Sequence, residues 1–119
     1  MCLYIKEKSR VQVAKKDIAV YKHLKLINGH YLTTYMDTIV LIGNTYESKL
    51  ERFHYTVNIG LHSFAYKRNC ISDGNCERAA VIVKCIIPKD SQYYVGEFLG
   101  GKSYASNKLQ YVEIVKILN

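Results

Sequence analysis

The chain has 119 residues, of which 49% are hydrophobic and 23% are charged, and its formal net charge is +7. This length suits one domain spanning residues 1–119 with a core of its own, and it is too short for two ordinary domains. The composition excludes a disordered chain, and no apolar run approaches the roughly 20 residues that a membrane-spanning helix needs.

The first part of the chain predicts short strands joined by turns. Alternating or β-branched apolar residues place strands at 3–5, 11–13, 17–26 and 38–42. The Asn28-Gly29 pair is a strong turn signal and predicts a hairpin between 20–27 and 30–35. The polar segment 47–52 is interpreted as one helical turn.

Two segments of the second half carry clear strand patterns. Residues 53–59 alternate apolar and polar side chains, which is the period of a half-buried strand, and Gly60 ends the alternation. Residues 79–87 are almost continuously apolar, which predicts a central strand buried on both faces. Pro88 ends this strand because proline has no amide hydrogen to donate.

The remaining patterns complete a sheet. Residues 92–99 are predicted as a strand beside the central one, and 109–118 as the last strand. A turn at 72–75 leaves room for a short helix at best after it. The predicted fold class is α+β, mainly β: a single compact domain with a twisted, mostly antiparallel sheet of about six to eight strands and little helix.

Positive charge is concentrated near the N-terminus. The cations there are Lys6, Lys8, Arg10, Lys15, Lys16, Lys22 and Lys25, and they face only two acids, Glu7 and Asp17. Such an excess can bind nucleic acid or an acidic protein surface. Exposed lysines also protect an edge strand from pairing with another chain, so a binding surface and a solvated edge both stay open as interpretations.

The cysteines are expected to be free thiols. The N-terminal segment lacks the apolar core of a signal peptide, which predicts an intracellular protein with reduced Cys2, Cys70, Cys76 and Cys85. A structural zinc site usually needs two close pairs of ligands, and Cys85 lies inside an apolar run. No metal is therefore expected.

The chain is also rich in tyrosine. Its 11 tyrosines could form a platform on which nucleic-acid bases stack. They are scattered along the sequence, however, and tyrosine is common in half-buried strands. The sequence therefore favours a structural use.

Several motifs resemble those of small uncharacterised proteins of bacteriophages and mobile elements. They are Val20-Tyr21-Lys22, Ile42-Gly43-x-x-Tyr46, Gly60-Leu61-His62-Ser63-Phe64, Ile87-Pro88-x-x-Ser91-x-Tyr93-Tyr94-x-Gly96 and Tyr104-Ala105-Ser106. The resemblance covers most of residues 18–114. It implies a phage-type accessory protein made in the cytoplasm of a bacterial host.

A second resemblance is to ADP-ribosyltransferase-like domains. The matching positions are Tyr21-Lys22-His23, His62-Ser63-Phe64 and Tyr111-Val112-Glu113. The resemblance implies that Lys22, Ser63 and Glu113 line one NAD-binding cleft. Glu113 would stabilise the charge that develops at the nicotinamide ribose, and His62 would serve as an acid or base.

The chain also departs from that second pattern. Lys22 stands where arginine is expected, and lysine lacks the planar fork that grips a pyrophosphate. Tyr111 occupies the first position of the expected Glu-x-Glu pair. Simpler roles remain open, because Glu113 suits the polar face of a strand and His62 can anchor its own loop by hydrogen bonds.

The residues favour a binding protein over an enzyme. The first hypothesis is a phage accessory protein that binds a host protein, a protein–nucleic acid complex or a nucleic acid, with no cofactor, as an inhibitor of a defence system such as CRISPR. The alternatives are an active or degenerate ADP-ribosyltransferase-like domain that binds NAD, and a structural protein of the virion. The number of copies in the functional unit stays open.

Overall fold

The structure is a computed structural model that describes residues 3–72, 79–98 and 100–118, and the molecule measures 41 × 26 × 21 Å along its principal axes. The strands are β1 (Leu3–Tyr4), β2 (Gln12–Val13), β3 (Ile18–Ile27), β4 (His30–Thr33), β5 (Ile39–Val40), β6 (Thr45–Glu47), β7 (Glu51–Phe53), β8 (Thr56–Ile59), β9 (Leu61–Phe64), β10 (Val81–Ile87), β11 (Gln92–Phe98), β12 (Gly101–Ser106) and β13 (Lys108–Ile117). The helix is α1 (Lys67–Ser72).

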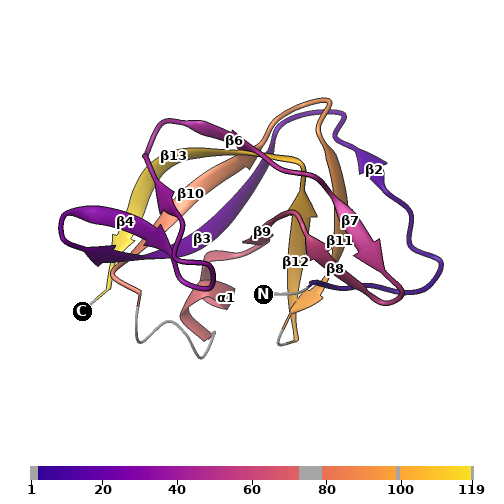
Figure 1. Ribbon diagram of the computed structural model, residues 1–119, viewed down its shortest axis with the longest axis horizontal. Coiled ribbons are helices and arrows are strands. Elements are labelled where there is room, and N and C mark those ends of the chain that lie inside the picture. The colour runs from indigo at the N-terminus through magenta and orange to yellow at the C-terminus, as the bar shows by residue number, and fades with distance from the viewer. Residues whose placement is uncertain (1–2, 73–78, 99, 119) are drawn as a thin grey trace.

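All described strands belong to one antiparallel sheet. Its main path runs β6-β13-β10-β3-β9-β12-β11-β1-β8-β7, with β2 paired to β11 and with β4 joining β3 to β5. Figure 1 shows β3, β10 and β13 side by side in one half of the molecule, and β7, β8, β11 and β12 in the other. The prediction of a mainly β chain with an antiparallel sheet and little helix is confirmed, although the sheet has 13 strands rather than about six to eight.

The predicted central strand is confirmed. Strand β10 lies between β13 and β3, and most of its side chains are buried. Pro88 follows its last residue, as expected for a residue that cannot donate to the ladder. The hairpin of β3 and β4 is confirmed as well, since Ile27 pairs with His30 across the turn.

The core lies on both faces of the central strands. One face holds a cluster that includes Val20, Leu24, Val83, Leu109 and Tyr111. The other face holds Phe64, Cys70 and Ile82, where α1 packs against β3 and β9 (Figure 1). A third cluster, built on Leu3 and Val57, lies beneath β1 and β8.

Two predicted elements are wrong between residues 47 and 59. The alternating segment 53–59 is not one strand, because the chain reverses at His54 and Tyr55 and forms the hairpin of β7 and β8. His54 adopts a φ of 53°, a turn conformation that the alternation of side chains does not reveal. The segment 47–52 is not helical either, because it holds the end of β6 and the start of β7 with no helix between them.

Other differences concern strand neighbours and the helix. Strand β11 does not pair with β10 but with β12, β1 and β2. Strand β12 lies in a segment for which the sequence predicted no strand. Helix α1 precedes the predicted turn at 72–75, and the short helix expected after that turn lies outside the described residues.

Candidate functional site

A pocket of about 390 Å³ lies against the core face of β3, and we call it the Lys22 pocket. Its walls come from β3, β6, β8, β9, β13 and the loop that follows β4. This volume is in the range of small-molecule sites. The sequence predicted two of its residues, Lys22 and His62, as candidate site residues.

Lys22 is the cation that lines this pocket. The alternation of β3 directs Val20, Lys22 and Leu24 to the core face, so a charged group sits among apolar neighbours. Its Nζ donates a 2.7 Å hydrogen bond to the carbonyl oxygen of His62. Burial is the main cause that lowers the pKa of Lys22.

His62 contributes a neutral ring to the same pocket. Its Nε2 lies 2.9 Å from the carbonyl oxygen of Val57, so this nitrogen carries the proton and donates it. Burial lowers the pKa of His62 to about 4, and the hydrogen bond to Val57 offsets only part of that effect. The ring is therefore uncharged at neutral pH and ties β9 to β8, which matches the anchoring role left open by the sequence.

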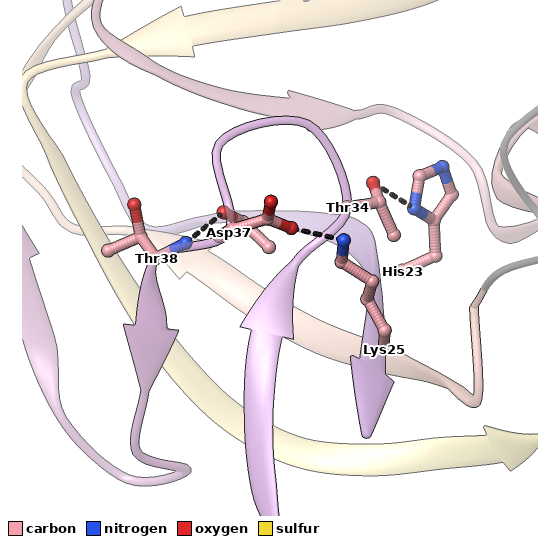
Figure 2. Close-up of polar contacts among 6 residues, drawn as sticks. His23, Lys25, Thr34, Asp37 and Thr38 are labelled. Carbon is pink, nitrogen blue, oxygen red and sulfur yellow. Dashed lines mark hydrogen bonds and ion pairs between the residues drawn. The ribbon is translucent and has the colours of Figure 1, made fainter. Parts of the chain in front are cut away.

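The loop between β4 and β5 forms one wall and is tied to β3 at two points. Figure 2 shows the Thr34 hydroxyl against Nδ1 of His23, at 2.8 Å, and the carboxylate of Asp37 in an ion pair with Lys25. Within the loop, Thr38 donates its backbone N–H to the side chain of Thr33. The wall is thus held by polar contacts in addition to packing.

Two tyrosines line the opposite side of the pocket. The rings of Tyr46 and Tyr111 meet edge to face with centroids 5.6 Å apart. The backbone N–H of Leu41 donates to the Tyr46 hydroxyl at 2.8 Å. Burial raises the pKa of Tyr111, so its phenol stays protonated at all physiological pH values.

Ser63 and Glu113 do not share this pocket. Ser63 is buried, and its hydroxyl makes no hydrogen bond with the described residues. Glu113 is exposed and pairs in register with Lys84 of β10, which in turn pairs with Tyr21.

Directly paired residues point to the same face of a sheet, so Glu113 lies on the face of Tyr21. Lys22 follows Tyr21 in β3 and points to the other face. The sheet therefore separates Lys22 from Glu113, and the convergence that an NAD-dependent transferase requires is absent for these three residues.

A second candidate site is the basic arm, which we define as residues 6–16. Its cations Lys6, Lys8, Arg10, Lys15 and Lys16 are all exposed. The arm leaves the sheet after β1 and returns to it at β2, so its first turn projects from the edge of β11. Lys22 and Lys25, which the sequence grouped with these cations, lie instead in the pocket and in the ion pair with Asp37.

Arg52 holds the base of the basic arm. Its guanidinium donates to the backbone carbonyl oxygens of Lys6, Glu7 and Ser9, and also to that of His54 in its own hairpin. One fork-shaped side chain thus closes the turn of the arm against β7. Sequence reasoning missed this residue because it lay in the segment interpreted as a helical turn.

Exposed aromatic side chains flank the basic arm, and we call Tyr4, Phe53 and Tyr55 the aromatic rim. Tyr4 is 58% exposed and Phe53 is 67% exposed. Both pair in register with Thr56, so they lie on the same face of the sheet. The backbone N–H of Ile5 donates to the carbonyl of Tyr55 at 2.8 Å, which brings the rim against the start of the arm.

A hollow of about 360 Å³ lies between the start of the basic arm and β11, and its lining includes Tyr4 of the aromatic rim, Lys6, Ser9 and Glu97. The tyrosines that seemed scattered in the sequence are therefore partly gathered by strand pairing. Basic and aromatic groups side by side are the combination that binds single-stranded nucleic acids.

Metal binding and thiol chemistry find no support in the described residues. Among them, no three His, Cys, Asp or Glu side chains come together where a metal ion could be held. Burial raises the pKa of the Cys85 thiol to about 12, so it stays protonated.

None of the helical residues described forms a segment long and apolar enough to cross a membrane. Comparisons with protein-family models, curated proteins and solved structures find no match for this chain.

Proposed function

We propose that this protein binds an anionic macromolecule of a bacterial host through its basic arm. It acts without a cofactor, as a bacteriophage accessory protein in the host cytoplasm. Its target is a host protein or a protein–nucleic acid complex. A defence complex of the CRISPR type presents such a target, because it carries guide RNA and displaced single-stranded DNA.

The observation that carries the proposal is a set of exposed cations on a segment that is already held in place. Lys6, Lys8 and Arg10 project from the turn that Arg52 closes. A pre-ordered segment loses less conformational entropy on binding than a free tail does. Clustered cations also steer an anionic partner toward the surface before contact.

The aromatic rim supports a nucleic acid as part of the target. Stacking of a base on an exposed aromatic ring contributes about 1–3 kcal/mol. Tyr4 and Phe53 expose their rings beside the arm and so offer this contact where the cations would hold the backbone. The resemblance of several motifs to those of phage and mobile-element proteins supports the biological setting.

The test is a pull-down from bacterial lysate at low salt, with the tag placed at the C-terminus so that the N-terminal segment stays native. The arm variant carries Lys6→Glu and Lys8→Glu, two of the exposed lysines on the turn that Arg52 closes. Its matched control carries Lys67→Glu and Lys116→Glu, the same charge change at exposed lysines outside the arm. We expect the wild type and the control to recover the same stoichiometric partner and the arm variant to lose it.

Nuclease treatment of the recovered complex then separates a nucleic acid from a protein partner. Failure of the wild type to recover any stoichiometric macromolecule would contradict the proposal, as would full retention by the arm variant. Recovery of the chain from purified phage particles, with no partner in lysate, would favour a structural role in the virion instead.

A further inference from the structure

We propose that the Lys22 pocket is a binding site for a small monocarboxylate with an apolar body, whose carboxylate contacts the ammonium of Lys22. The site is distinct from the basic arm, because the arm is exposed and the pocket lies against the core face of β3. A test of this site is therefore independent of a test of the proposed macromolecular target.

The charges around Lys22 carry the first part of the inference. An ammonium group has three N–H donors, and among the described residues its hydrogen bonding is limited to the carbonyl of His62. No carboxylate of the described chain pairs with it. Glu47 also lines the pocket, but its carboxylate lies 3.4 Å from the ammonium of Lys108. A buried cation without an anion is costly, and a bound carboxylate would neutralise it.

The pocket's total charge limits the ligand to a monoanion. The ring of His62 is held neutral, so among the described lining residues the side chain of Lys22 is the group that can carry positive charge. Burial lowers the pKa of Lys22, and a bound carboxylate favours its charged form. The carboxylate of Glu47 at the edge of the pocket is already paired with Lys108, so Lys22 leaves one unbalanced positive charge. A monocarboxylate balances that charge, whereas a phosphate dianion would bring one negative charge more than the pocket can pair.

The walls determine the body of the ligand. Leu61, Val40 and Met36 supply apolar surface, and the edge-to-face pair of Tyr46 and Tyr111 supplies aromatic surface. Flat apolar groups pack well against such rings. The volume of about 390 Å³ accommodates a small ring or a short chain rather than a macromolecule.

The pocket is also pre-formed on its loop side. The contacts of Thr34 with His23 and of Asp37 with Lys25 fasten the loop to β3, as Figure 2 shows. Asp37 donates its backbone N–H to the carbonyl of Thr33, which closes the turn on itself. A ligand therefore binds against a loop that is already ordered, which limits the loss of conformational entropy on binding.

The experiment titrates isotope-labelled protein with benzoate and, in parallel, with benzamide, while backbone amide chemical shifts are followed by NMR. Benzamide has nearly the same shape but no charge. The site variant is Lys22→Met, which removes the ammonium and keeps an unbranched apolar chain. The matched control is Lys84→Met, a lysine of the neighbouring strand β10 that points to the opposite face.

We expect saturable shifts of pocket amides such as those of Leu61 and His62 with benzoate. Benzamide should bind the wild type at least about tenfold more weakly, and benzoate should bind Lys22→Met more weakly by a similar factor, since a charge-assisted hydrogen bond is removed. Lys84→Met should bind benzoate as the wild type does.

Three results would overturn the inference: no saturable binding of benzoate, equal binding of benzoate and benzamide, or an equal loss of affinity in both lysine variants. If Lys22→Met does not fold, the comparison of benzoate with benzamide on the wild type still decides the question.

Discussion

The guanidinium of Arg52 donates a hydrogen bond to the carbonyl oxygen of Ser9, a residue 43 positions earlier in the chain. This hydrogen bond joins the hairpin of β7 and β8 to the basic arm and brings the aromatic rim beside the cations. The same guanidinium also donates to the backbone carbonyl oxygens of Lys6 and Glu7. The shape of the arm therefore depends on the half-buried side chain of Arg52 rather than on contacts among the residues of the arm.

Replacing Arg52 with methionine should loosen the basic arm while keeping an unbranched apolar side chain. Removal of one charge-assisted hydrogen bond costs about 1 kcal/mol or more, which corresponds to at least about fivefold more frequent local opening. We expect limited trypsin digestion, followed by mass spectrometry, to show faster cleavage after Lys8 and Arg10. The control is Arg68→Met, whose guanidinium lies over the ring of exposed Tyr66. Unchanged cleavage in Arg52→Met would show that the arm holds its own shape.

Replacing Thr34 with valine should destabilise the protein through the loop wall of the Lys22 pocket. The hydroxyl of Thr34 lies 2.8 Å from Nδ1 of buried His23, and valine removes this hydrogen bond with little change in shape. We expect urea unfolding to report a decrease in stability of about 1 kcal/mol or more. Thr34→Ser keeps the hydroxyl and should cost clearly less. Equal decreases in the two variants would assign the effect to packing.

His62 should make stability depend on pH. Its pKa is lowered from 6.5 in the unfolded chain to about 4 in the folded one. Between these values the unfolded chain binds more protons, so stability is full above pH 6.5 and is lost as the pH falls toward 4, by about 3 kcal/mol in total. The free energy of unfolding is measured by urea titration at several pH values. In His62→Gln, the part of its decrease between pH 6.5 and 4 that comes from His62 should be absent.

The control for this pH series is His30→Gln, because His30 is exposed on β4. Its profile should follow that of the wild type. Parallel profiles of the wild type and His62→Gln between pH 4 and 6.5 would contradict the assignment of a neutral, buried His62.

Gly96 should tolerate no side chain, because the backbone of β1 approaches it closely. A Cβ atom at this position would overlap the carbonyl oxygen of Tyr4 and press on the side chain of Ile5. Gly96→Ala should therefore displace β1 and destabilise the protein by about 1–3 kcal/mol in urea unfolding. Gly29→Ala meets no atom within 4 Å but carries the strain of a positive φ, so it reports that strain alone. A cost of Gly96→Ala below about 1 kcal/mol would contradict the close approach of β1.

The sequence predicted local structure where a single residue type determines the backbone. Asn28 and Gly29 adopt φ angles of 52° and 80°, the left-handed conformation that this pair accepts readily. The apolar run of β10 and the proline after it were equally clear. The reversal at His54 was missed because side-chain alternation continues on both sides of the turn, so the pattern alone resembles one strand.

The candidate sites were harder to predict because they depend on long-range pairing. Lys22 and His62 were selected as separate motifs, and only the pairing around β3 and β9 brings them into one pocket with Tyr111. The sequence could not show that Glu113 faces away, since that depends on its register with Lys84. The exposed cations 6–16 were predicted directly, because charge is visible without the fold.

The most direct test of the central claim is the affinity of the protein for a fluorescent single-stranded DNA, measured by anisotropy over a range of salt concentrations. The variant Lys6→Glu with Lys8→Glu is compared with the control Lys67→Glu with Lys116→Glu. We expect the arm variant to bind at least about tenfold more weakly at low salt, with a log–log salt slope shallower by about 0.7 for each phosphate that the protein no longer neutralises. The control should keep wild-type affinity and slope. An equal weakening in the two variants would show that only net charge matters and would contradict a binding site on the basic arm.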